Sequence, residues 1–261
     1  AMPAPMEGLS ALKREIAAIA GTGCKLADSG PHALPLGIAG IDAALCGGLA
    51  LGAVHELEPA APVHRGTMFG FALALAGRAL QARQGGDVLW IETAFATAEI
   101  GGLYGLGLEA FGLSPARVLI VRVARPRDVL WVMEEALRCR GIAAAVAELT
   151  AAADLTATRR LSLAARLAGG LGLLARHRAL PQASAAMTRW QVAAAPSRPD
   201  ALGGLGPAAF DLTLTKNRHG PCGRWTILWD HHDRAFRDPA LSFGMAEQAR
   251  DRSDRALRRA G

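Results

Sequence analysis

Closely spaced cysteines are missing from this sequence. Its four cysteines, Cys24, Cys46, Cys139 and Cys222, stand far apart, and no two of them form a C-x-x-C pair. Such pairs build most cysteine-based zinc sites, and dense cysteine patterns build the disulfide frameworks of small secreted domains. We therefore expect neither a disulfide framework nor a metal site in this protein.

Long apolar runs are missing as well. Arg, Gly or Glu interrupts every apolar stretch well before the roughly 18 residues that a membrane-spanning helix needs. The first residues, AMPAPMEGLS, lack the basic region and apolar run of a secretory signal. These absences favour a cytoplasmic protein that makes no contact with a membrane.

Lysine is scarce, although the chain is basic overall. Lys+Arg number 29 against 23 Asp+Glu, a net charge of +6, yet lysine occurs only at Lys13, Lys25 and Lys216. This charge balance permits binding to nucleic acids or acidic proteins without establishing it. No lysine stands between Lys25 and Lys216, so the centre of the chain has none to offer a nucleotide phosphate.

The order of apolar segments predicts an α/β fold. Hydrophobic residues make up 51% of the chain, enough to bury a large core. Strands are predicted over 54–57, 88–91, 117–123, 142–149 and 172–175, and helices over 67–82, 99–111, 126–140 and 156–168. Three further strands, without helices between them, are predicted over 188–194, 210–216 and 225–230. This pattern is typical of a mixed, mainly parallel sheet that ends in antiparallel edge strands.

Both ends of the chain differ from this core. We predict an N-terminal amphipathic helix and linker over 1–30, a core over 31–240 and a charged tail over 241–261. The helix carries an apolar stripe that either packs on its own domain or docks on a second chain, formed by Leu9, Leu12, Ile16 and Ile19. The tail is either solvated or contacts a partner through its arginines, Arg250, Arg252, Arg255, Arg258 and Arg259.

Several segments resemble known proteins. The run 34–57, with Asp42 and the pair Gly47-Gly48, resembles the segment that precedes the phosphate loop of RecA-type proteins, and the likeness extends to about residue 230. A closer resemblance is to the ImuA family, the RecA-like proteins of bacterial SOS mutagenesis cassettes. Four segments carry it: LWVMEEAL at 130–137, LTATRRL at 155–161, SAAMTRW at 184–190 and WTILWD at 225–230, the last followed by Phe236.

The ImuA resemblance implies a function and partners. It implies a RecA-like core and an accessory role in translesion DNA synthesis after DNA damage. The implied partners are ImuB, an inactive relative of Y-family polymerases, and an error-prone replicative-type polymerase, with RecA as a further candidate. We expect a non-enzymatic adaptor. The alternatives are a module that binds single-stranded DNA or RecA filaments, and a protein that retains nucleotide binding.

The phosphate-loop position departs from a working ATP site. A functional loop reads G-x-x-x-x-G-K-[ST], because glycines let backbone N–H groups wrap the phosphates and lysine neutralises their charge. The first glycine and the lysine are missing from the matching segment, and its two prolines donate no N–H. The residues of this degenerate position are Glu58, Pro59, Pro62, Arg65, Gly66 and Thr67. The resemblance places Ala94 where ATPases carry a catalytic glutamate, and Glu148 where they carry a metal-supporting aspartate. We therefore expect no ATP hydrolysis and no cofactor.

Arginines suggest a surface for single-stranded DNA. In RecA-type proteins the loop after the strand at 172–175 meets DNA, and arginine is well suited to phosphate contacts. The candidate contact residues are Arg159, Arg160, Arg176, Arg178 and Arg189. No aromatic residue is interleaved with them to stack bases, so a solvated basic surface is the alternative.

Overall fold

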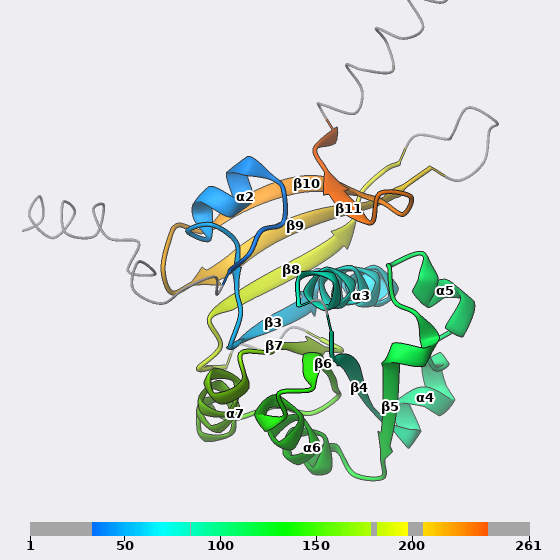
Figure 1. Ribbon diagram of the computed structural model, residues 1–261, viewed down its shortest axis with the longest axis vertical. Helices are drawn as coiled ribbons and strands as arrows, with labels where there is room; N and C mark the ends of the chain where they lie inside the picture. Colours follow the sequence, from blue (N-terminus) through cyan, green and yellow to red (C-terminus); the bar gives the residue numbers. More distant parts are fainter. Residues whose placement is uncertain (1–32, 84, 179–181, 198–205, 240–261) are drawn as a thin grey trace, which may run out of the picture. The chain divides into compact units, whose positions relative to one another are not determined.

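A computed structural model describes residues 33–83, 85–178, 182–197 and 206–239 of the chain. All of these residues belong to one compact unit (Figure 1). The predicted apolar stripe from Leu9 to Ile19 and the tail arginines from Arg250 to Arg259 lie outside the described residues. In the described part, no helix combines the length and apolar character needed to cross a bilayer.

Nine of the described strands form one mixed sheet. Six of them run parallel: β3 (Ala53–Pro59), β4 (Asp87–Thr93), β5 (Val118–Val123), β6 (Ile142–Leu149), β7 (Leu171–Arg176) and β8 (Thr188–Ala194). Three antiparallel strands follow: β9 (Ala208–Asn217), β10 (Gly223–Asp230) and β11 (Ala235–Arg237). Their order across the sheet is β11-β10-β9-β8-β3-β7-β6-β4-β5, which confirms the predicted mixed architecture. A separate two-stranded ladder joins β1 (Ala33–Leu34) to β2 (Leu49–Ala50).

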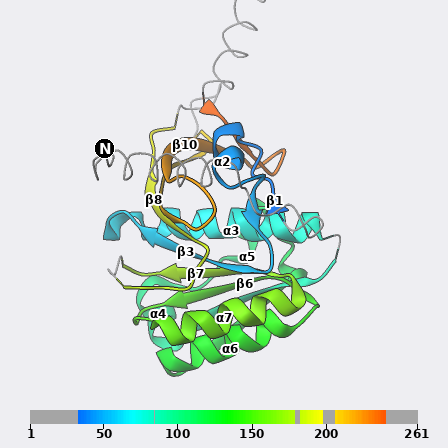
Figure 2. The same ribbon diagram turned by 90° about the vertical axis from the view of Figure 1, so that its left-hand side faces the viewer.

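Helices cover both faces of the sheet (Figure 2). The first, α3 (Arg65–Ala82), lies on one face over the apolar cluster that contains Trp90. Two further helices, α6 (Pro126–Arg138) and α7 (Leu155–Ala168), pack on the other face over the cluster that contains Ile91. Parallel strands need such crossovers, and their alternation along the chain is what the apolar pattern predicted. The carboxylate of Asp154 accepts a hydrogen bond from the N–H of Ala157 at 2.6 Å, which caps the start of α7.

The predicted helix over 99–111 is wrong. Two short helices occupy this region, α4 (Ala94–Ile100) and α5 (Gly105–Glu109). Gly101 ends the first of them with φ at 85°, a backbone conformation that side-chain-bearing residues rarely adopt. A further short helix, α2 (Ala39–Ala44), and the strands β1, β2 and β11 were not predicted.

A buried histidine joins three strands. The Nε2–H of His55 donates to the carbonyl oxygen of Ala50 at 2.9 Å, so Nδ1 carries no proton and accepts from the Thr188 hydroxyl at 2.8 Å. The same hydroxyl oxygen accepts the indole N–H of Trp190 at 2.9 Å. Burial lowers the pKa of His55 to about 4, so the ring stays neutral near pH 7 and acts as a structural link from β2 through β3 to β8.

We expect Gly77→Ala to destabilise the fold. A methyl group at Gly77 would meet the carbonyl oxygen of Phe111 at 2.1 Å, which forces α3 away from the turn that follows α5. The free energy of unfolding should fall by about 1–3 kcal/mol, measured by urea denaturation. Gly70→Ala is the matched control in the same helix, because its nearest atom lies at 3.5 Å, an ordinary contact. The control should be neutral or gain up to about 1 kcal/mol of helix propensity. Equal stability of the two variants would contradict this account of the packing.

Candidate functional site

The candidate site is the edge of the sheet at which the parallel strands end. Open α/β sheets bind ligands outside these carboxyl ends, at the point where the strand order changes direction. Here the order changes at β3, because α3 leads away from it on one face and α6 and α7 lead back to it on the other. Buried polar side chains gather along this edge: Glu58, Glu92, Glu148, Arg176 and His177.

The degenerate phosphate loop is tied to the neighbouring strand. After Pro59 the chain turns through a single 3-10 helix, Pro62–His64, and α3 begins at Arg65. The N–H of Ala60 donates to the carbonyl oxygen of Val192 in β8 at 2.9 Å. Thus β8 holds the loop at its start, where a phosphate-binding loop needs its N–H groups facing the ligand.

Few backbone donors remain in this loop. The two prolines have none, and the N–H of His64 donates to the carbonyl oxygen of Ala61 at 2.9 Å. The imidazole of His64 accepts the N–H of Ala194 at 3.2 Å, a second link to β8. Gly66 and Thr67 lie in the first turn of α3 rather than in a loop. The successive N–H groups of a phosphate cradle are therefore not assembled here.

A buried carboxyl group stands at the end of β3, one residue before Pro59. Glu58 is 3% exposed, and burial raises its pKa above the ordinary value, an effect that the charges of Arg189 and Arg176 only partly offset. The Nε of Arg189 lies 3.2 Å from the Glu58 Oε1. A carboxyl group at the end of β3 makes the position less favourable to a phosphate than a neutral residue would.

The position expected to support a metal is enclosed by aromatic side chains. The indole N–H of Trp90 donates to Glu148 Oε1 at 2.6 Å, and the Nε2 of His177 lies 3.3 Å from Glu148 Oε2. Phe69, from α3, packs edge-on against both rings, with centroids 5.9 Å from Trp90 and 5.6 Å from His177. Both carboxylate oxygens of Glu148 are thus directed at internal partners, and three rings fill the end of β4, β6 and β7 under α3.

The second carboxylate of this edge is also engaged. Glu92, 2% exposed, accepts a hydrogen bond from the Nε of Arg122 at 2.6 Å. Ala94 lies at the exposed start of α4, whose first turn is capped by the hydroxyl of Thr93 at 3.2 Å from the Ala96 nitrogen. Among the residues that the structure places, no three His, Cys, Asp or Glu side chains are grouped as a metal site would require.

Two of the five candidate DNA-contact arginines share a buried carboxylate, that of Glu56. Arg176 is 1% exposed, and its Nη2 donates to Glu56 Oε1 at 2.5 Å. The Nε of Arg189 donates to Glu56 Oε2 at 2.7 Å, with the side chain 16% exposed. Burial alone raises the pKa of Glu56, but the Arg176 charge and the hydrogen bonds from both arginines outweigh it and hold the pKa below its usual range. The surface placement of Arg176 is therefore corrected, since it is buried against Glu56, whereas Arg189 is partly exposed and its contact with DNA stays a prediction.

The other three arginines remain on the surface. Arg159 and Arg178 are exposed, and Arg160 pairs with Glu134 at 2.6 Å while staying 62% exposed. Their contact with single-stranded DNA stays a prediction.

Sequence reasoning missed the aromatic enclosure of Glu148. The signal was present in the alternation of β4, in which Trp90 and Glu92 point to the same face. The sequence does not show that β4 pairs with β6. In that pairing Trp90 lies opposite Val146, and the side chains on the α3 face of both strands become neighbours.

We expect Glu56→Ala to lower the free energy of unfolding by about 3–5 kcal/mol, because it leaves the buried Arg176 without its carboxylate. Arg160→Ala is the control, with an expected loss below about 1 kcal/mol, because Arg160 is 62% exposed and Glu134 keeps its second partner, Arg138. Chemical denaturation of both variants measures the difference. A small loss for Glu56→Ala would show that Arg176 reaches solvent and would return it to the surface candidates.

The sequence was compared with known proteins. No protein-family model matches it. The protein named ImuA from Caulobacter vibrioides, found in two strains, is 36% identical over 194 residues, which cover 69% of this chain and 76% of the Caulobacter protein. Identity at this level over more than two thirds of the chain confirms the family suggested by the four segments. The chain belongs to the ImuA family.

Proposed function

We propose that this chain is a non-enzymatic accessory protein of SOS-induced translesion DNA synthesis, which acts as an adaptor for an ImuB-type inactive polymerase homologue. Membership of the ImuA family supports the accessory role in SOS mutagenesis. The wider complex would include the error-prone replicative-type polymerase, with RecA as a further candidate partner. The adaptor role itself is the step that goes beyond the family.

The enclosure of Glu148 is the main observation that supports a function without enzymatic activity. Hydrolysis of ATP requires a carboxylate that is free to support the metal ion and a loop that wraps the phosphates. The Trp90 indole and His177 occupy the carboxylate, and Pro59 and the bond from Ala60 to β8 remove donors from the loop. Binding of a nucleotide would have to break these internal contacts before it could form its own.

The adaptor part rests on what remains when the nucleotide site is lost. The nine-stranded sheet and its helices keep a rigid core, since α3, α6 and α7 bury apolar clusters on both faces. A rigid domain of this kind can present fixed surfaces to other proteins without a nucleotide-driven change of shape. Docking then depends on surface residues alone.

The expected result is a stable complex between this chain and the ImuB-type protein of the same genome, purified without nucleotide or DNA. Calorimetric titration should return the same dissociation constant with and without Mg-ATP, because the site beneath α3 takes no nucleotide. Apyrase treatment of both preparations is the control for carried-over ATP. Failure to associate at micromolar concentrations, or association only when ATP is present, would contradict the proposal.

A further inference from the structure

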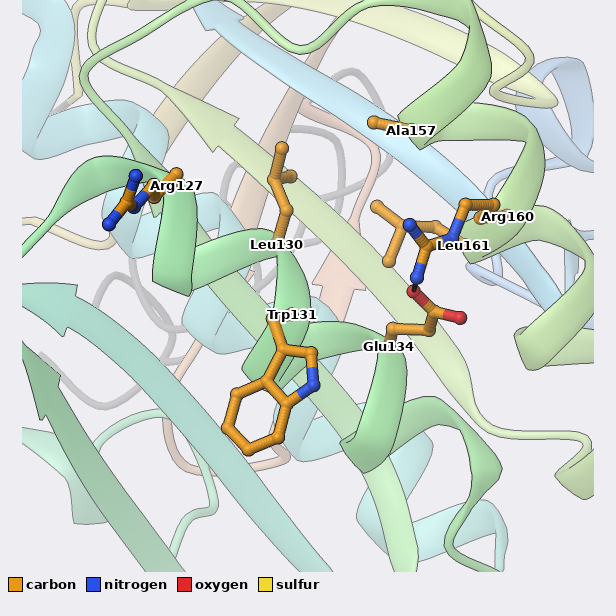
Figure 3. Close-up of a pocket in the computed structure, with 7 residues that line it drawn as sticks. All are labelled: Arg127, Leu130, Trp131, Glu134, Ala157, Arg160 and Leu161. Carbon is orange, nitrogen blue, oxygen red and sulfur yellow. Dashed lines mark hydrogen bonds and ion pairs between the residues drawn. The ribbon is translucent and has the colours of Figure 1, made fainter.

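A groove separates the outer faces of α6 and α7 (Figure 3). Its volume is about 210 Å³. Leu130, Trp131 and Glu134 line it from α6, and Ala157, Arg160 and Leu161 line it from α7. The ion pair between Arg160 and Glu134, 2.6 Å between Nη2 and Oε2, joins the two helices at one end.

Large apolar side chains are exposed beside this groove. The Trp131 side chain is 62% exposed, although it belongs to a helix whose Val129 and Met133 are fully buried. On α7, Leu163 and Leu167 are 63% and 68% exposed, and they follow Arg160 by one and two turns. Single exposed apolar residues are common on protein surfaces, but their grouping next to a groove is typical of a binding surface. These exposed side chains are not part of the apolar core beneath the helices.

The charge around the groove favours an acidic occupant. Between Leu155 and Ala168, α7 carries three arginines and no acidic residue. Glu134, the carboxylate in the groove, is 5% exposed and is already paired with Arg138 and Arg160, both at 2.6 Å. At the first turn of α6, Arg127 lines the groove; its side chain is 73% exposed, and its Nε lies 3.7 Å from Asp128 Oδ1 in a surface ion pair. Carboxylates of a partner would therefore meet guanidinium groups at the rim.

The shape favours a helix over a nucleic acid. Residues at i, i+3, i+4 and i+7 of α6 form one wall, so the groove follows the helix axis, and an amphipathic helix can lay its apolar face into a groove of this kind. The floor is aliphatic, from Leu130, Ala157 and Leu161, and Trp131 is the one aromatic ring among the lining residues. Single-stranded DNA binds instead through successive aromatic platforms, and the lining residues supply a single aromatic ring.

Both walls belong to segments that carry the family resemblance. The α6 wall lies mostly within LWVMEEAL at 130–137, and the α7 wall lies within LTATRRL at 155–161. The degenerate nucleotide site gives no role to the side chains that line the groove.

We propose that the α6–α7 groove is the docking site for an amphipathic helical segment of the ImuB-type partner, with an apolar side chain beside Trp131 and carboxylates toward Arg127 and Arg160. This proposal rests on the proposed adaptor function and names the surface that performs it. Aromatic and arginine side chains at the centre of an interface supply most of its binding energy. Trp131 is the expected anchor.

The test compares dissociation constants for the full-length ImuB-type protein of the same genome, measured by calorimetry with the full chain. Trp131→Ala and Arg127→Glu should each weaken binding roughly tenfold or more. Phe95→Ala is the matched control, since this aromatic side chain on α4 is 74% exposed and outside the groove, and it should change binding less than about twofold. Thermal denaturation confirms that each variant folds as the unaltered chain does.

The outcomes separate the two proposals. If the unaltered chain binds and both groove variants bind equally well, the groove proposal is overturned while the adaptor function stands. If the unaltered chain does not bind, both are overturned. A fluorescent single-stranded oligothymidine serves as the second probe: loss of DNA affinity in Trp131→Ala, with partner affinity unchanged, would identify a nucleic-acid surface and overturn the groove proposal.

Discussion

Buried charge at the carboxyl edge of a parallel sheet must find a partner, and in this protein every described partner is internal. A carboxylate removed from water costs several kcal/mol unless hydrogen bonds and opposite charge compensate it. Nucleotide-binding proteins of this architecture direct such groups at a metal ion or at phosphates. Here Glu148 is held by Trp90 and His177, Glu92 by Arg122, and Glu56 by Arg176 and Arg189. The contacts of Glu56 link β8 to β3 through Arg189 and account for the burial of Arg176.

These internal contacts support the proposal that the protein works without a nucleotide switch. Loss of the phosphate loop alone would leave an open crevice with unpaired carboxylates. Phe69 and the rings of Trp90 and His177 instead fill the space beneath α3, so the core stays dense. The functional surface is then free to lie elsewhere. The outer faces of α6 and α7, with an exposed tryptophan between arginines, are on the opposite face of the sheet from α3.

Much of the fold could be predicted because its signals are local. The continuous apolar runs of β4 and β6 and the Asp154 cap of α7 belong to single segments, and the structure confirms them. The broken helix at 94–109 was missed because apolar spacing outweighed the four glycines at 101, 102, 105 and 107. The site was predicted less well because its partners are distant in sequence. Arg176 looked like a loop residue, and only the pairing of β7 with β3 brings it to Glu56 across 120 positions. No rule of composition or spacing reports such a pairing.

Equilibrium binding of nucleotide tests the central claim most directly. Mg-ATP is titrated calorimetrically into the full chain, up to millimolar nucleotide, with a functional RecA-type ATPase measured alongside as the positive control. The account predicts no saturable heat, because Glu148 and the loop from Pro59 to His64 have their partners already. Saturable binding at one site with a micromolar dissociation constant would contradict it, and would mean that the aromatic enclosure opens to admit a nucleotide.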